Sequence, residues 1–121
     1  MLTKTAIGRA GEDLVMRYLE QNGYHIRTHN YRTQRGEIDI IAERGETLAF
    51  VEVKTRQTAT FELSTVITPS KKRRIFLAAR SYCIRYQTFN RSLRFDVAVV
   101  VFDRTPPITY YENAFTEDDH G

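Results

Sequence analysis

The spacing of hydrophobic residues along this chain predicts two helices. Residues 7–21 carry an apolar stripe at helical spacing, and Gly23 suits the left-handed cap that ends such a helix. A second stripe begins after Thr68 and Pro69, which suit a helix N-cap and a first turn, and it reaches Tyr86. Both helices are amphipathic, so each needs another surface to cover its apolar side.

The remaining apolar segments are extended. Residues 37–42 and 47–55 are rich in β-branched side chains, and Arg44-Gly45 between them supplies the turn of a hairpin. Residues 92–102 are apolar almost without interruption, which is typical of an internal, buried strand. Further extended or irregular segments are a strand at 24–28, a polar loop at 29–36, a loop at 56–68 and an edge strand at 108–115.

The elements follow in the order α-β-β-β-α-β, to which the edge strand adds a last member. This order predicts an α/β or α+β fold in which helices flank one mixed β-sheet. A chain of 121 residues suits a single domain. We expect that domain to span residues 1–115, with the acidic residues 116–121 as a disordered tail.

Composition favours a cytoplasmic protein without membrane contact. The chain is 41% hydrophobic and 27% charged, no apolar run could span a bilayer, and the N-terminus lacks a signal peptide. Its one cysteine, Cys83, has no internal partner for a disulfide, which suits a reducing compartment. A net charge of +3 despite the acidic tail suits a polyanion such as nucleic acid, although ordinary solubility charge explains it too.

Three charged residues interrupt the predicted hairpin where a core would favour Val or Leu: Asp39, Glu52 and Lys54. Pairing the strands through the predicted turn puts Asp39 opposite Phe50, which makes Glu52 its diagonal neighbour. The three charged side chains then share one face, with the Cα atoms of Asp39 and Glu52 about 7–8 Å apart. Two such carboxylates repel unless a cation compensates them, and oxygen ligands favour Mg²⁺ or Mn²⁺. The simpler interpretation is an exposed ladder of ion pairs.

Four segments occur in a fixed order: "GRAGEDLVMRYLEQNGY", "GEIDIIA", "FVEVKTR" and "RFDVAVV". Together they resemble the small, uncharacterised bacterial YraN-type family, which is similar in fold to archaeal Holliday-junction resolvases. An acid followed by Glu-x-Lys on the next strand is the signature of the PD-(D/E)xK nuclease superfamily. The resemblance covers residues 8–115. It implies a restriction-endonuclease-like core that hydrolyses phosphodiester bonds with Mg²⁺ or Mn²⁺.

The resemblance also implies four site residues: metal ligands at Asp39 and Glu52, a catalytic lysine at Lys54 and an additional acid at Glu12. Glu12 lies at the margin of the first apolar stripe, where its side chain is able to face the sheet. Gly8 and Gly11 would let that helix approach closely. Taken without the resemblance, Glu12 is better explained as a boundary glutamate in a surface ion pair.

Basic residues provide candidate contacts to a nucleic-acid backbone. They lie in the polar loop and at the start of the second helix: Arg32, Arg35, Lys71, Lys72, Arg73 and Arg74. A cationic cluster at a helix start opposes the macrodipole, which favours another use such as phosphate binding. A solvated helix face is the alternative. Asp96 is expected to anchor a neighbouring loop or helix end, and His25 and His29 are too few for a zinc site.

The sequence therefore predicts a metal-dependent endonuclease-like protein that acts on DNA, with branched or damaged DNA as candidate substrates. A nucleic-acid-binding module that keeps the nuclease fold without cleaving is the alternative. A scaffold that acts through a partner is a third interpretation. The related resolvases pair, so the resemblance also suggests a homodimer.

Overall fold

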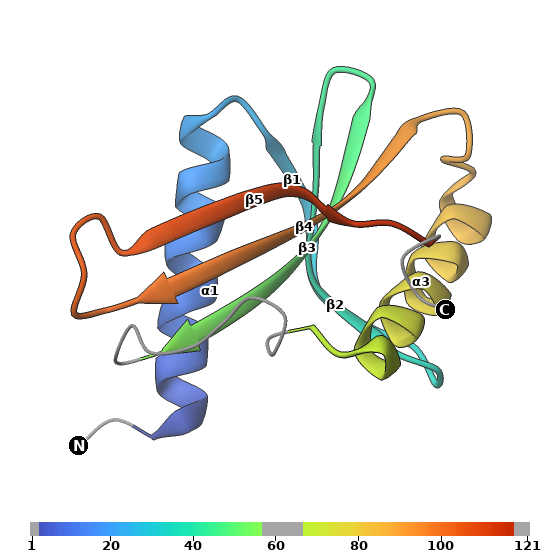
Figure 1. The fold of residues 1–121 in the computed structure, drawn as a ribbon. Helices are drawn as coiled ribbons and strands as arrows, with labels where there is room; N and C mark the ends of the chain where they lie inside the picture. Colours follow the sequence, from blue (N-terminus) through green and yellow to red (C-terminus); the bar gives the residue numbers. More distant parts are fainter. Residues whose placement is uncertain (1–2, 57–66, 118–121) are drawn as a thin grey trace.

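The computed structural model of the protein describes residues 3–56 and 67–117 (Figure 1). Its elements in chain order are α1 (Lys4–Gln21), β1 (His25–Arg32), β2 (Glu37–Arg44), β3 (Thr47–Arg56), α3 (Pro69–Tyr86), β4 (Ser92–Val101) and β5 (Ile108–Phe115). This mixed α+β order confirms the predicted fold class, including the last strand. The arrangement is consistent with a restriction-endonuclease-like fold.

The described strands form one mixed sheet in the spatial order β1-β2-β3-β4-β5. Neighbouring strands are antiparallel except β3 and β4, which run parallel. A parallel pair needs a crossover connection, and α3 lies in the segment that joins these two strands. The internal position of β4 and the edge position of β5 are both as the sequence predicts.

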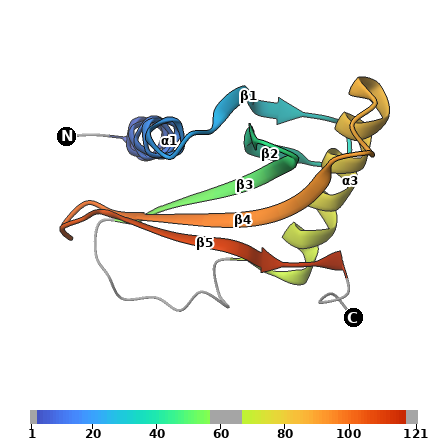
Figure 2. The same cartoon turned by 90° about the horizontal axis from the view of Figure 1, so that it is seen from above.

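The sheet has a hydrophobic core on each face, because side chains alternate sides along a strand. On the α1 side, Val15 and Leu19 of the helix pack with Val51 and Val100. On the α3 side, a larger and more aromatic cluster gathers around Phe50, Phe76, Tyr82 and Phe95. Figures 1 and 2 show the two helices well apart, with the strands between them.

Two glycines allow close contacts between neighbouring elements. A Cβ at Gly11 of α1 would overlap the Thr55 hydroxyl and stand 3.2 Å from the Thr55 Cβ. A Cβ at Gly36 would overlap the carbonyl oxygen of Arg74 in α3. Gly8 is different, because nothing lies within 4 Å of an added Cβ. The predicted close approach of α1 is thus confirmed at Gly11 and wrong at Gly8.

The β2–β3 turn falls one residue later than predicted. Phe50 pairs with Ile41 instead of Asp39, which shifts the register by two positions. The reason is that Gly45 takes the first turn position, with a φ of +59°, and Glu46 the second. Glycine in the first position is typical of one of the two hairpin turns that match strand twist. A shift of two does not change which side chains share a face in the paired segments 40–44 and 47–51.

The first strand is longer than the sequence indicates. Residues 29–32 were expected in a polar loop, but they continue β1 and pair with β2. Tyr31 explains this, because it packs against the α3-side core and pairs with the buried Ile38. Its neighbours are polar because β1 is an edge strand. The predicted loop at 56–68 and tail at 116–121 lie mostly outside the residues that the structure describes.

Asp96 is a structural anchor, as predicted, but it holds the neighbouring strand β5 instead of a loop or helix end. Its side chain is 0% exposed and accepts hydrogen bonds from the Arg94 guanidinium at 2.8 Å and the Tyr110 hydroxyl at 2.6 Å. The backbone N–H of Asn113 donates a third bond at 2.9 Å. A buried carboxylate with this many donors is a structural group, so Asp96 is not a candidate for the site.

Candidate active site

The candidate site lies where β2 and β3 separate. Their ladder ends with the pair Ile40 and Val51. Beyond this pair, the Oδ2 atom of Asp39 accepts a hydrogen bond from the backbone N–H of Val53 at 2.8 Å. A side chain thus satisfies a donor that the neighbouring strand no longer reaches. This bond holds the Asp39 carboxylate inside the fork between the strands.

A cavity of about 260 Å³ opens at this fork, and four separate elements contribute to its wall. Its lining residues are Glu12 from α1, Glu37 and Asp39 from β2, Glu52, Val53 and Lys54 from β3, and Lys71, Arg74 and Ile75 from α3. The structure therefore brings together all four residues that the sequence predicts as the catalytic set. They meet although Glu12 and Lys54 are far apart in the chain.

Among the acids of the cavity, Glu52 has the most strongly raised pKa. Burial and the neighbouring Asp39 carboxylate raise the pKa of Glu52 to about 8, against the opposing effect of Lys54 and Lys71. Two acids facing one partly desolvated space account for this shift. The two lysines compensate only part of the charge, so the pair has room for further positive charge.

Lys71 reaches this cavity from the first turn of α3. Thr68 caps the helix there by accepting a hydrogen bond from the backbone N–H of Lys71 at 3.2 Å, as the sequence predicts. Burial, followed by contact with the Lys54 ammonium, lowers the pKa of Lys71, while Glu52 and Asp39 act in the opposite direction. Two ammonium groups therefore face two carboxylates across one small space.

Glu12 completes the acidic side of the cavity. Burial raises the pKa of Glu12, and the Asp39 carboxylate adds to this shift. A hydrogen bond from the Asn30 side chain and the nearby His29 act in the opposite direction. Neither β1 residue was predicted as a neighbour of Glu12, because residues 29–36 were expected to form a loop. Asn30 has a φ of +52°, a conformation that asparagine tolerates better than most residues.

Only two of the six predicted backbone-binding residues line the acidic cavity. These are Lys71 and Arg74, one helical turn apart on α3. The residues between them turn away, since Lys72 lies over the Phe115 ring and Arg73 lines a different cavity. The remaining two lie near the start of β2: Arg32 pairs with Glu37 at 3.2 Å, and Arg35 lines a shallow hollow beside α3.

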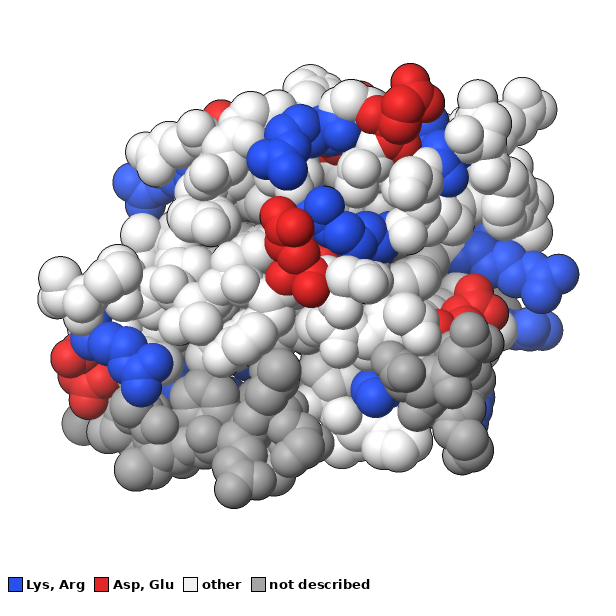
Figure 3. All heavy atoms as spheres, turned by 45° about the horizontal axis from the view of Figure 1, so that its top comes forward, with Lys and Arg blue, Asp and Glu red and all other residues white. Residues whose placement is uncertain are grey.

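The surface in Figure 3 shows the same dispersal of charge. On this face, Lys and Arg alternate with Asp and Glu in small groups on a mostly uncharged surface. The part of it that the structure describes offers no broad basic patch for a polyanion. Lys71 and Arg74 lie instead beside the acids of the cavity.

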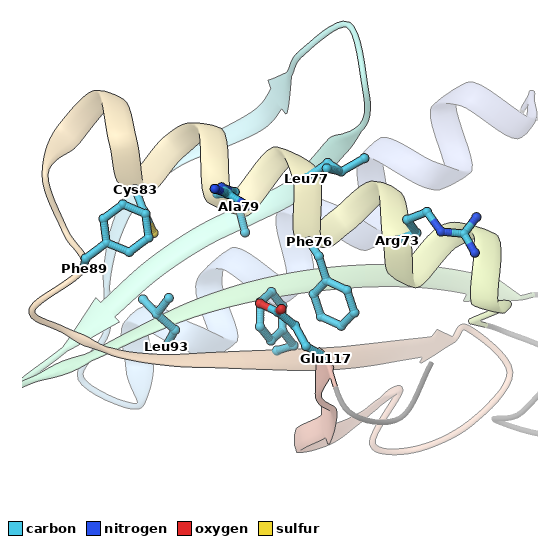
Figure 4. A pocket seen from close by; sticks show the side chains of 10 residues that line it. Arg73, Phe76, Leu77, Ala79, Cys83, Phe89, Leu93 and Glu117 are labelled. Carbon is cyan, nitrogen blue, oxygen red and sulfur yellow. The ribbon is translucent and has the colours of Figure 1, made fainter. Parts of the chain in front are cut away.

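A second cavity, of about 390 Å³, has a different character (Figure 4). It lies between α3 and the start of β4, and its wall is largely apolar, with Phe76, Leu77, Cys83 and Leu93. Burial raises the pKa of the Cys83 thiol, which makes a thiolate nucleophile unfavourable there. Glu117 is the single acid in its described lining, so this cavity lacks the paired carboxylates of the fork.

The fork offers a pair of carboxylates that would suit a divalent cation. Within residues 3–56 and 67–117, no group of three His, Cys, Asp or Glu side chains is arranged to hold a metal ion. Mg²⁺ commonly uses one or two carboxylates and keeps several waters, and Asp39 with Glu52 supplies such a pair. The hard oxygen donors and the raised pKa of Glu52 both fit a divalent cation of this kind.

Comparison with other proteins gives the family. Residues 11–100 match the uncharacterised protein family UPF0102. The chain belongs to the UPF0102 family. A UPF0102 protein of Alkaliphilus metalliredigens is 40% identical over 111 residues, covering 91% of this chain and 97% of the relative. Another from Geobacter sulfurreducens is 41% identical over 112 residues, with 90% and 88% covered.

The UPF0102 match includes all four predicted catalytic residues, and it stops before β5 and begins within α1. A relative from Chlorobium limicola extends the similarity, with 40% identity over 123 aligned positions and 93% of this chain covered. The predicted family is thereby confirmed. In the part of this UPF0102 protein that the structure describes, neither helix has the length and apolar character needed to cross a membrane.

Proposed function

We propose that this UPF0102 protein is a metal-dependent nuclease that hydrolyses phosphodiester bonds in DNA. The observation that carries the proposal is the meeting of Asp39, Glu52 and Lys54 in one small cavity at a strand fork. An acid followed by Glu-x-Lys on the next strand is also the order that the PD-(D/E)xK resemblance predicts. The mixed sheet with its two helices is consistent with that resemblance.

Asp39 and Glu52 would hold the divalent cation. When bound there, Mg²⁺ or Mn²⁺ polarises a phosphoryl oxygen and lowers the pKa of a coordinated water. The hydrogen bond from the Val53 N–H keeps the Asp39 carboxylate oriented toward the fork before substrate arrives. Glu52, which shares the cavity with it, loses its proton more readily when a cation compensates its charge.

Lys54 and Lys71 place positive charge where a phosphate would lie. Lys54 stands beside both acids and stabilises the negative charge that develops on the phosphoryl oxygens. Because Lys54 lies beside two carboxylates, this electrostatic role suits it better than the role of a base. Glu12, whose pKa is raised, is placed to orient a water molecule at the acidic side of the cavity.

A cleavage panel tests the proposal. The protein is incubated with Mg²⁺ or Mn²⁺ and with linear, single-stranded, flapped and four-way DNA. We expect cleavage of at least one substrate and a loss of about 100-fold or more in Lys54→Ala, the scale of a lost electrostatic stabiliser. Equal activity in that variant would assign the cleavage to a contaminant and overturn the proposal.

The alternative is a module that binds nucleic acid without cleaving it. The observation in its favour is the pair of cations on α3, Lys71 and Arg74, which would bind phosphate even without hydrolysis. Mn²⁺ titration separates the two functions. Calorimetric Mn²⁺ binding that depends on Asp39 supports the nuclease. DNA binding without Mn²⁺ binding supports the passive module.

A further inference from the structure

A second hollow continues the acidic cavity along α1. It has a volume of about 620 Å³ and shares Glu12, Val53 and Lys54 with the acidic cavity. Its other lining residues are Lys4, Ile7 and Gly8 of α1, and Thr55 and Arg56 of β3. Because Glu12, Val53 and Lys54 line both, the two spaces adjoin at the fork, and together they are called the groove.

Charge along this groove is arranged in three parts. The acids occupy its middle, at the fork. Lys71 and Arg74 of α3 lie at one end, and Lys4 and Arg56 line the other. A polyanion that crosses the fork would therefore meet cations on both sides of the acids. The basic cluster of the α3 end is visible in the sequence, whereas Lys4 and Arg56 of the α1 end lie far apart in the chain.

Gly8 leaves the α1 end of the groove open. Nothing lies within 4 Å of a Cβ built at this position, and the residue lines the hollow. Its neighbour Gly11 serves contact with Thr55, but Gly8 serves no such contact. Glycine in a helix interior is unfavourable by about 1 kcal/mol relative to alanine. The glycine that leaves this space open therefore lowers the stability of the helix.

The described lining of the groove consists of charged, aliphatic and small side chains. No Phe or Tyr is among these described residues. Proteins that hold single strands usually stack bases on aromatic rings, whereas contacts to phosphates alone suit a duplex backbone. Such contacts carry no direct sequence information.

We propose that this groove holds one backbone of duplex DNA across the fork, and that the first turns of α1 form its second phosphate-binding arm. This inference rests on the proposed nuclease function and names the substrate class of the same site. Lys4 contributes a phosphate contact, and Gly8 lets the backbone approach the helix. Recognition is independent of base sequence and falls steeply with salt.

Variants at Gly8 test the second arm. Gly8→Glu places a carboxylate in the groove, and Gly8→Ala, which adds only a methyl group, sets the reference. We expect Gly8→Glu to bind a fluorescent duplex about tenfold more weakly than Gly8→Ala in EDTA, because like charges meet. Arg9→Gln is the charge control, since it lowers the net charge by one unit, as Gly8→Glu does, at an exposed residue of the same helix that does not line the hollow.

Three outcomes would overturn the inference. They are equal duplex binding by Gly8→Glu and Gly8→Ala, a loss as large in Arg9→Gln, and tighter binding of a single strand than of the duplex. Circular dichroism verifies that each variant is folded. Binding is measured without a divalent cation, so the proposal of a DNA-binding groove is tested independently of the proposed nuclease activity. If duplex binding is weakened by Gly8→Glu but the wild-type protein does not cleave DNA, only the proposed nuclease function is refuted.

Discussion

At the scale of single residues, Asp39 has two roles that different substitutions separate. Its Oδ2 atom accepts the Val53 N–H, which supports the fold. Its negative charge, next to Glu52, creates the demand for a cation. An asparagine would retain an acceptor oxygen but not the charge, whereas an alanine would remove both.

We predict that Asp39→Asn keeps the free energy of unfolding within about 1 kcal/mol of wild type and loses Mn²⁺ binding. Asp39→Ala should lose Mn²⁺ binding and also about 1–3 kcal/mol of stability, because the Val53 N–H is left without its acceptor. Urea unfolding and calorimetry measure the two effects. Wild-type Mn²⁺ affinity in Asp39→Asn would contradict the assignment of this residue as a ligand.

Glu52 makes stability depend on pH. Its pKa rises from an ordinary 4.5 to about 8 on folding, so the folded protein binds a proton more tightly than the unfolded chain. The stabilisation is complete below pH 4.5 and is lost as the pH rises through about 8. Deprotonation in the folded state then leaves two carboxylates facing each other.

We therefore predict that wild-type protein in EDTA loses stability between pH 5 and pH 9, and that Glu52→Gln loses roughly 1–3 kcal/mol less. This range allows for solvent screening at a half-buried group. Glu20→Gln, at an exposed position on α1, is the matched control and should follow wild type. Parallel profiles of stability against pH for wild type and Glu52→Gln would show that the pKa of Glu52 is not raised on folding.

At the scale of elements, the contact between α1 and β3 decides where Glu12 lies. Gly11 permits this contact by leaving space for Thr55, one residue from Lys54. Any side chain at Gly11 would move the helix away from the strand. Because Glu12 is the next residue, the same movement would draw its carboxyl out of the cavity.

We predict that Gly11→Ala destabilises the protein by about 1–3 kcal/mol, the usual range for overpacking. Gly8→Ala is the matched control in the same helix, and it should stabilise by up to about 1 kcal/mol, since its Cβ meets nothing. Thermal and urea unfolding measure both. Equal effects of the two changes would mean that α1 is not held closely against β3.

At the scale of the whole molecule, the two helices contribute charged side chains to one fork from opposite faces of the sheet. α1 brings Glu12 from one core, and α3 brings Lys71 and Arg74 from the other. Helical rotation sends Lys72 elsewhere, to the ring of Phe115. Adjacent lysines of α3 therefore have different relations to a bound polyanion.

This difference predicts distinct salt dependences for DNA binding. Lys71→Ala should reduce the slope of log affinity against log salt by about 1, as expected when one phosphate contact is lost. Lys72→Ala removes the same charge one position along and should change the slope less. Fluorescence titration over a salt series measures both. Identical slopes for the two variants would indicate a response to overall charge instead of a groove.

Local patterns in the sequence determined most of the elements and the face of each charged residue. Helical spacing located both helices, and the capping role of Thr68 was correct. The common face of Asp39, Glu52 and Lys54 followed from strand parity, which survives any shift by an even number of residues. The register itself was wrong by two positions, because either of two residue pairs could form the turn around Gly45.

Only the tertiary structure decided what meets at the fork. The end of the β2–β3 ladder at Ile40 frees the Val53 N–H for Asp39, and no local pattern specifies where two strands separate. The separation of Lys71 from Lys72 and the α1 arm at Lys4 likewise depend on how helices lie against the sheet. Local periodicity sets which side a residue faces, whereas long-range contacts set its neighbours.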